Sequence, residues 1–259
     1  MNDQQENIFF ELHSDLPREG PGNFASTKTA FSLLTDLPDE PLILDIGCGP
    51  GKQTLDLTKI TKGKIVALDN HKPYLDTLDK KIDEHNLGQR VSTKLGDMNN
   101  LQFDESSFDV IWAEGSIYLM GFGKALGLWK KFLKPNGYIV FSELCWFKND
   151  RPEEIDNYWL SYYGPMNSID GITGFLTNTD YKFVGNYVLP DEAWWEDYYS
   201  PLHKRLISLK QKYKNDTEAL EVLENELKEM EMHKKYSAYY GYSFFVVQRR
   251  NNKNGSSKN

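Results

Sequence analysis

Short apolar runs alternate with amphipathic stretches along the first 145 residues. The apolar runs are flanked by polar residues, glycine or proline, as is typical of buried strands. They lie at about 42–45, 64–69, 90–95, 107–112 and 138–144. The stretches between them have apolar residues at helical spacing and predict helices at about 26–34, 52–61, 73–87 and 123–133. Strands that alternate with helices over short connections predict an α/β fold with a doubly wound parallel sheet.

The rest of the chain follows a different pattern. Residues 181–189 and 241–249 read as two strands, and about fifty residues separate them. That insertion contains two predicted helices, at about 202–213 and 217–235. The second has Leu220, Leu223, Leu227 and Met230 on one face. We expect this face to pack on the domain, with a homodimer contact as the alternative.

The pattern also predicts the domain organisation. We expect a polar N-terminal arm at 1–22, one domain at 23–249 and a disordered tail at 250–259. Within the domain, the aromatic segments at about 145–180 and 190–240 are expected to form a helical lid.

The composition of the chain disfavours several classes of partner and site. The net charge of −8 disfavours nucleic acid or an anionic membrane as the main partner. The two cysteines, Cys48 and Cys145, suggest neither a disulfide framework nor a metal site. The N-terminus lacks a signal-peptide pattern, and no run approaches the roughly 18 apolar residues of a membrane span. We therefore expect a cytoplasmic protein without a metal.

The stretch Leu44–Lys52 combines an acid with three alternating glycines, between a predicted strand and a predicted helix. The dinucleotide pattern G-x-G-x-x-G fails because position 52 is lysine, and the P-loop pattern fails at Ile46 and Gln53. The pattern D-x-G-x-G-x-G remains, as does a bare strand-to-helix turn. Free N–H groups at a helix N-terminus would point at a ligand bound there.

This stretch, read as LDIGCGPG, resembles the first motif of class I S-adenosylmethionine-dependent methyltransferases. The resemblance covers about residues 25–145. Within the family, the chain is most similar to the ubiquinone/menaquinone-biosynthesis-like branch, which acts on small molecules. It implies a seven-stranded sheet whose last strand is antiparallel. The long insertion before that strand departs from the simplest family pattern and weakens the inference about the substrate.

The resemblance also implies a set of cofactor-binding residues. Four consecutive predicted strands end near an acid, and parallel strands present their carboxyl ends along one edge. Asp69 matches the acid that binds the ribose hydroxyls, and Asp97 the acid that accepts from the adenine amino group. The expected cofactor-binding residues are Asp45, Gly47, Cys48, Gly49, Gly51, Thr54, Asp69, Asn70, Asp97, Met98 and Glu114.

Methyl transfer is a displacement at the sulfonium methyl, so the enzyme chiefly positions the acceptor and excludes water. A base is needed only if the acceptor must lose a proton early. Candidates are Glu114, Tyr118 and Glu143, which is predicted to close its strand, whereas His71 could equally contact adenine or solvent. 

Aromatic residues after residue 145 are the candidates for substrate binding. They could stack on an aromatic acceptor or bind a cationic amine, or simply form the apolar underside of the lid. The residues singled out are Trp146, Tyr163, Trp194, Trp195 and Tyr198.

Three alternatives to small-molecule methylation stay open. They are a non-catalytic protein that binds S-adenosylmethionine, methylation of a protein substrate, and a nicotinamide-dependent oxidoreductase. Lys52 in place of a third dinucleotide-motif glycine argues against the oxidoreductase.

Overall fold

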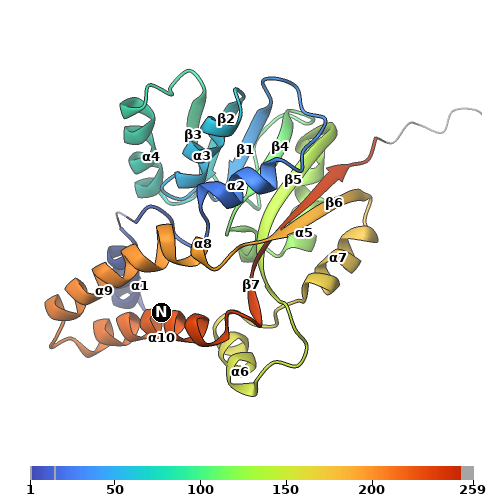
Figure 1. The fold of residues 1–259 in the computed structure, drawn as a ribbon. Coiled ribbons are helices and arrows are strands. Elements are labelled where there is room, and N and C mark those ends of the chain that lie inside the picture. The colour runs from blue at the N-terminus through green and yellow to red at the C-terminus, as the bar shows by residue number, and fades with distance from the viewer. Residues whose placement is uncertain (1, 15, 252–259) are drawn as a thin grey trace, which may run out of the picture.

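A seven-stranded sheet forms the centre of the computed structural model, which describes residues 2–14 and 16–251 (Figure 1). Its order is β3-β2-β1-β4-β5-β7-β6. The strands are β1 (Leu42–Ile46), β2 (Lys64–Asp69), β3 (Val91–Leu95), β4 (Phe108–Ala113), β5 (Leu133–Trp146), β6 (Tyr181–Val188) and β7 (Tyr240–Arg249). The first five run parallel, and β7 is antiparallel to both of its neighbours. The predicted fold class is therefore confirmed.

Helices cover both faces of the sheet. One face carries α2 (Phe24–Phe31), α3 (Lys52–Ile60) and α4 (Lys72–Glu84), and the other carries α5 (Phe122–Trp129) and α7 (Ile169–Thr177) (Figure 1). Short 3-10 turns, η1 (Ile117–Leu119) and η2 (Lys130–Phe132), flank α5. Successive strand residues point to opposite faces. Ile43 accordingly joins the core under α2–α4, whereas Leu44 joins the core under α5 and α7.

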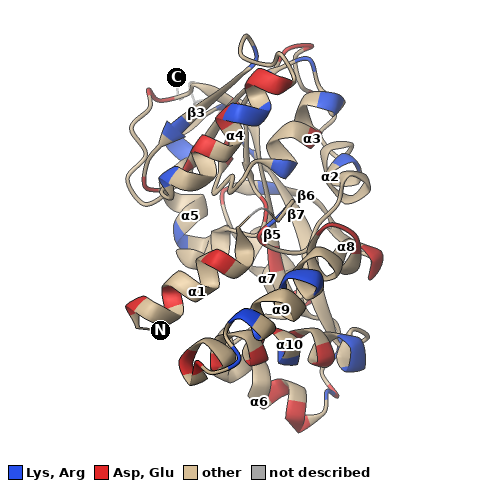
Figure 2. Cartoon of the chain, turned by 90° about the vertical axis from the view of Figure 1, so that its left-hand side faces the viewer, with Lys and Arg blue, Asp and Glu red and all other residues tan. Residues whose placement is uncertain are grey.

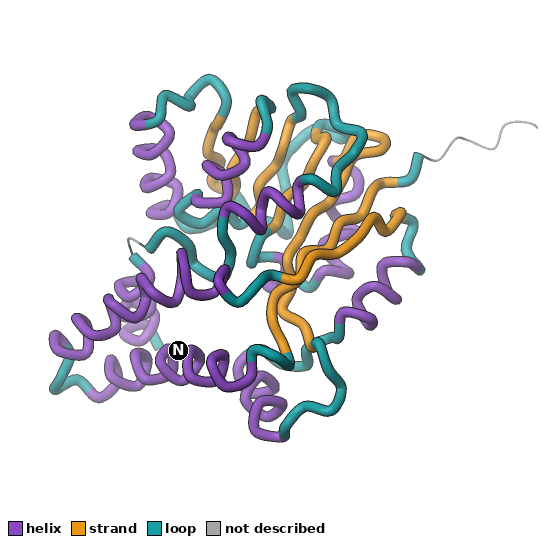
Figure 3. Tube along the Cα trace, in the orientation of Figure 1, coloured by secondary structure: helices purple, strands orange, loops and turns teal. Residues whose placement is uncertain are grey.

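A separate group of helices lies beyond the carboxyl ends of the strands, where the long strands β5 and β7 reach down to it (Figures 1 and 3). It consists of α1 (Asp3–His13), α6 (Glu153–Tyr162), α8 (Glu192–Trp194), the π-helical turn η3 (Trp195–Tyr199), α9 (Ser200–Lys212) and α10 (Thr217–Tyr236). These helices share a hydrophobic core of their own, rich in tryptophan and tyrosine. Of the longer helices in this group, α1 and α6 carry acids without lysine or arginine, α9 carries lysine and arginine without acids, and α10 carries both (Figure 2).

The N-terminal segment, expected to be a polar arm, contains helix α1. Asn2 caps it through a capping box with Gln5, and Ile8 and Leu12 are buried in the same core as α9 and α10. The pair Ile8 and Leu12 has the i, i+4 spacing of a single apolar stripe, which is a weak sequence signal. Helix α10 packs its own apolar residues inward in the same group.

Strand β5 extends further than the pattern predicted. Its pairing with β7 continues from Tyr138 opposite Gln248 to Trp146 opposite Tyr240. Glu143 therefore lies inside the strand, opposite Ser243, and the prediction that it closes the strand is wrong.

Two further observations complete the fold. Arg250, at the start of the tail expected to be disordered, donates to the Tyr181 carbonyl oxygen at 3.1 Å, whereas residues 252–259 lie outside the described residues. No helix within the described residues combines the length and apolar character needed to cross a bilayer.

Candidate functional site

The glycine turn between β1 and α3 is held in left-handed backbone conformations. Gly47, Gly49 and Gly51 have φ values of 69°, 51° and 87°, which cost little only for glycine. The Gly47 N–H donates to the Leu68 carbonyl oxygen at 2.8 Å, and the Gly49 N–H donates to Asp69 Oδ2 at 2.9 Å. The end of β2 thus fixes the shape of the turn.

The three glycines meet different surroundings. A Cβ on Gly47 would lie 2.4 Å from Ser116 Cβ, and one on Gly51 would lie 2.2 Å from Leu78 Cδ1. Both positions allow elements of the fold to pack closely. A Cβ on Gly49 would find only Glu19 Cγ, at 3.5 Å. Gly49 is therefore the glycine that faces the N-terminal segment rather than the core.

Three of the predicted acids come together behind this turn. Asp45 is fully buried, and its Oδ2 accepts from Thr54 Oγ1 at 2.5 Å while its Oδ1 has no partner. Burial, with added repulsion from Glu114 and Asp69, raises the pKa of Asp45 to about 7. Asp69 Oδ1 accepts from the His71 N–H at 2.8 Å. The cluster therefore brings several carboxyl groups together, and one buried carboxyl oxygen in it has no hydrogen-bond partner.

The other predicted cofactor residues differ in their exposure. Asp97 is exposed, and its described hydrogen bonds stay within its own loop, where bonds from Asn99 lower its pKa. Asn70 is also exposed. Met98 Cε lies 3.7 Å from a Cβ placed on Gly47, beside the turn. Cys48 is buried within the turn, and burial raises the pKa of its thiol.

A short segment of the N-terminus, residues 18–22, crosses in front of the glycine turn; we name it the strap. Its Arg18 is buried, and its Nη1 donates to Glu114 Oε1 at 2.6 Å while its Nη2 lies 3.2 Å from Asp56 Oδ2. Sequence analysis missed Arg18 and Asp56. The available signal was a charged pair, Arg18-Glu19, inside a proline- and glycine-rich stretch.

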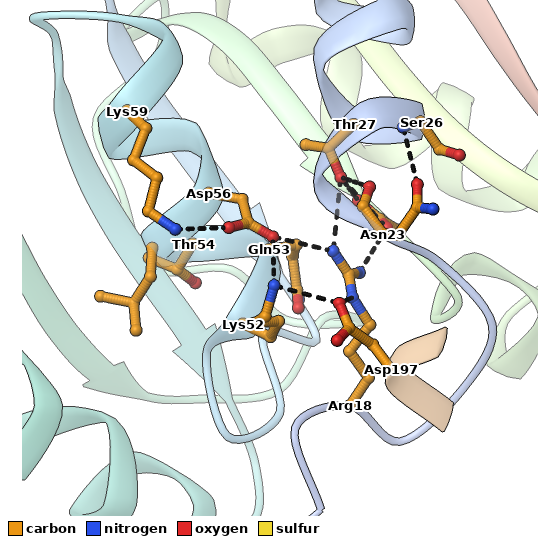
Figure 4. A network of polar contacts seen from close by, with 12 residues as sticks. Arg18, Asn23, Ser26, Thr27, Lys52, Gln53, Thr54, Asp56, Lys59 and Asp197 are labelled. Carbon is orange, nitrogen blue, oxygen red and sulfur yellow. Dashed lines mark hydrogen bonds and ion pairs between the residues drawn. The ribbon is translucent and has the colours of Figure 1, made fainter. Parts of the chain in front are cut away.

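The contacts of Arg18 join distant parts of the chain (Figure 4). Asp56 also pairs with Lys52 at 2.9 Å and Lys59 at 3.0 Å. Lys52 in turn lies 3.1 Å from Asp197 of η3, so the insertion before β7 is tied to the same network. The strap is therefore anchored to α3, to β4 and to the helical group.

The Glu114 carboxylate accepts hydrogen bonds from three side chains. Besides Arg18, its carboxylate accepts from Thr27 Oγ1 at 3.2 Å and from Trp112 Nε1 at 3.1 Å. These donors occupy both carboxylate oxygens of Glu114. The geometry gives Glu114 an anchoring role toward the strap.

Two cavities lie on either side of the strap. The smaller, of about 70 Å³, is bounded by the glycine turn, Glu114 and strap residues 18–21. The larger, of about 590 Å³, lies between the sheet edge and α1, α6 and α10; we name it the aromatic cavity. Glu19, Gly20 and Pro21 line both. The strap is thus a wall shared by the two cavities.

The predicted substrate residues divide between this cavity and the core. Tyr163, Trp194 and Tyr198 line the aromatic cavity. Trp146 and Trp195 are not among the residues that line it. Trp146 packs in the core under the Arg151 guanidinium, 4.3 Å from its ring, and Trp195 packs against Tyr199 at 5.2 Å between ring centroids.

The candidate bases other than Glu114 lie in different settings. Tyr118 lines the aromatic cavity, is 43% exposed, and lies 5.4 Å from the Tyr163 ring. Glu143 is 7% exposed; its Oε1 accepts from the Tyr163 hydroxyl at 2.9 Å, and its Oε2 has no partner. Burial raises the pKa of Glu143 to about 7. The His71 ring stacks on Phe10 of α1, with ring centroids 4.5 Å apart.

Comparison with known proteins agrees with this geometry. Residues 43–137 match the family described as a methyltransferase domain. Sterol 24-C-methyltransferase of Kluyveromyces lactis is 25% identical over 176 residues, which cover 64% of this chain and 47% of that protein. Demethylmenaquinone methyltransferase of Lactobacillus johnsonii is 29% identical over 153 residues, which cover 55% of this chain and 58% of that protein. The chain spans about half the length of these curated relatives.

The fold also resembles solved structures over nearly the whole chain. A crystal structure of a SAM-dependent methyltransferase from Geobacter sulfurreducens, in complex with S-adenosylhomocysteine, has a TM-score of 0.81 at 18% identity. The match covers 94% of this chain and 98% of that one. At this level of identity the likeness concerns the fold.

Proposed function

Because this chain contains a methyltransferase domain on the class I fold, we propose that it transfers a methyl group from S-adenosylmethionine to a small-molecule acceptor held in the aromatic cavity. The observation that carries the proposal is the glycine turn. Gly49 presents bare backbone, and the buried Asp45 Oδ1 behind the turn lacks a partner.

The residues around the turn fit this donor. S-adenosylmethionine carries a sulfonium and an ammonium group, and an acidic environment favours both. Asp45, Asp69 and Glu19 supply that environment, and burial raises the pKa of Glu19 to about 7 with a contribution from Asp69. Asp69 uses two of its roughly four acceptor sites on backbone N–H groups, which leaves capacity for ribose hydroxyls.

Space around the turn adds a requirement. The cavity between turn and strap is about 70 Å³, well below the roughly 300–1,000 Å³ of a typical ligand site. The donor therefore fits only when the strap shifts away from Gly49. Such a shift would also join the two cavities, since the strap separates them.

The chain's own residues would then act mainly by positioning. When bound, the donor supplies an electrophilic methyl group. The aromatic walls hold the acceptor and exclude water. Among the predicted bases, Glu143 is best suited to take a proton, because its pKa of about 7 lies near neutral pH and its Oε2 is free of hydrogen bonds. Tyr118 lines the aromatic cavity, and its hydroxyl would orient the acceptor.

The dimensions of the aromatic cavity favour a small acceptor over a protein chain. Its volume of about 590 Å³ falls in the range of small-molecule sites. The relatives above are named for methylation of a sterol and of demethylmenaquinone, which supports the same class of acceptor without identifying it.

The test has two stages. Calorimetry first measures S-adenosylmethionine binding to the wild type, to Gly49→Val and to Asp104→Ala, an exposed control acid in the loop before β4. We expect binding to the wild type and the control, and none to Gly49→Val. A metabolite panel is then screened for S-adenosylhomocysteine production. Normal binding to Gly49→Val would contradict the cofactor site, and binding without turnover on any acceptor would favour a non-catalytic protein.

A further inference from the structure

The aromatic cavity has a wall of acidic side chains. Among the described residues that line it there are four carboxylates and no lysine or arginine; the carboxylates are Glu19, Glu221, Glu226 and Glu229. The one basic side chain there is His13, and burial lowers its pKa to about 4, so it is neutral at pH 7. The cavity is therefore lined by carboxyl groups that have no lysine or arginine among the described lining residues to pair with.

Two of these acids are placed where a charge is costly. Glu226 and Glu229 lie one turn apart on α10 and are half-buried. Glu229 Oε1 accepts from the Tyr199 hydroxyl at 2.9 Å, and no hydrogen bond or ion pair of Glu226 is found among the described residues. Burial, with repulsion from Glu229, raises the pKa of Glu226 to about 8. Buried carboxylates are stabilised by a cation, and here the protein offers none.

The remaining walls also suit a cation. Tyrosine and tryptophan rings attract cations through their faces. The rings of Trp159 and Tyr163 are nearly perpendicular, with centroids 6.3 Å apart, and the Tyr118 ring lies 5.4 Å from that of Tyr163. Behind Tyr163, the buried Glu143 keeps one oxygen without a partner. Aromatic rings and carboxyl groups thus line the same cavity.

From this arrangement we propose that the methyl acceptor is an amine that enters the aromatic cavity as a cation, between the aromatic rings and the Glu226–Glu229 pair. The inference rests on the proposed function and specifies its acceptor class. The bound ammonium gives one proton to the Tyr163 hydroxyl, which passes its own proton to Glu143 Oε1, and the nitrogen lone pair then forms the bond to the methyl carbon. The carbon–sulfur bond breaks with its electron pair left on sulfur, and the positive charge passes to the nitrogen.

Choline and its neutral isostere 3,3-dimethylbutan-1-ol test the inference without turnover. The two differ in charge but little in shape, and choline has no site on nitrogen for a further methyl group. We expect titration of the 259-residue chain, by calorimetry and tryptophan fluorescence, to show that choline binds at least tenfold tighter than the alcohol, a difference of about 1.4 kcal/mol. Equal affinity, or preference for the alcohol, would overturn the proposal. Choline binding by a protein that does not bind S-adenosylmethionine would support the cavity but remove the proposed function.

Variants of α10 locate the effect. The double variant Glu226→Gln, Glu229→Gln keeps the shape of both side chains and removes their charge. We expect it to lose at least tenfold in choline affinity with little change for the alcohol, whereas Glu231→Gln, an exposed acid on the same helix, should bind as the wild type does. Choline should also release protons from the wild type, detected by calorimetry in two buffers of different ionisation enthalpy. Unchanged choline affinity in the double variant would refute the placement.

Discussion

Replacing Arg18 by methionine should destabilise the protein by about 3 kcal/mol, because it leaves buried carboxylates without their cation. The Arg18 side chain is 4% exposed, and those of Glu114 and Asp56 are 2% and 0% exposed. Breaking one partner out of a buried pair typically costs about 3–5 kcal/mol. We place the value at the low end because Asp56 keeps Lys52 and Lys59. 

Urea denaturation followed by tryptophan fluorescence at pH 7 measures this loss. In a separate thermal melt, the same loss in a chain of this size should lower the melting temperature by about 6–12 °C. Lys210→Met provides the matched control, since Lys210 pairs with Glu224, which is 64% exposed, and such surface pairs contribute about 1 kcal/mol or less. A loss below about 1 kcal/mol for Arg18→Met, or one equal to the control, would show that the strap is not anchored by this ion pair.

Three further predictions concern the turn and the cavity. Asp69→Ala should weaken S-adenosylmethionine binding by about 1–3 kcal/mol in calorimetry, because charge-assisted hydrogen bonds are lost, and unchanged affinity would remove the ribose role. Gly51→Ala should lower the free energy of unfolding by about 2–5 kcal/mol, because the overpacking of its Cβ, 2.2 Å from Leu78 Cδ1, adds about 1–3 kcal/mol to a left-handed strain of about 1–2 kcal/mol. Gly49→Ala should cost only that strain and should weaken cofactor binding, so equal destabilisation of the two variants in urea titrations would contradict this distinction. The folded state raises the pKa of Glu226 from 4.5 to about 8, so the free energy of unfolding of the wild type falls as pH rises between these values. Glu226→Gln should therefore stabilise the protein at pH 8 but not at pH 4. The same change in the free energy of unfolding at both pH values would contradict this prediction.

Much of the sheet could be predicted because its signals are local. Apolar runs and the glycine turn lie in continuous stretches of sequence, and parallel strands bring their carboxyl ends to one edge by topology alone. That rule placed Asp45, Asp69 and Glu114 near one another, as their mutual repulsion at Asp45 shows. It did not bring Asp97 into their contacts, because that residue sits beyond β3 in an exposed loop.

The walls of the candidate site depend on contacts between residues far apart in sequence. Arg18 reaches Glu114 over 96 positions, and Asn2 of the N-terminal helix contacts Glu218 over 216. Neither contact leaves a periodic signal in the sequence. Which aromatic residues line the cavity likewise depends on how α6 and α10 close against the sheet. Trp146 packs in the core, although Leu144, two positions earlier in the sequence, lines the cavity.

The strap has a thermodynamic consequence. Because Glu19, Gly20 and Pro21 form one wall of both cavities, a ligand that displaces the strap from either side changes the binding free energy on the other. Linkage makes this effect reciprocal: the factor by which S-adenosylhomocysteine alters choline affinity must equal the factor by which choline alters S-adenosylhomocysteine affinity. A five-residue loop would then make cofactor and acceptor recognition a single cooperative equilibrium.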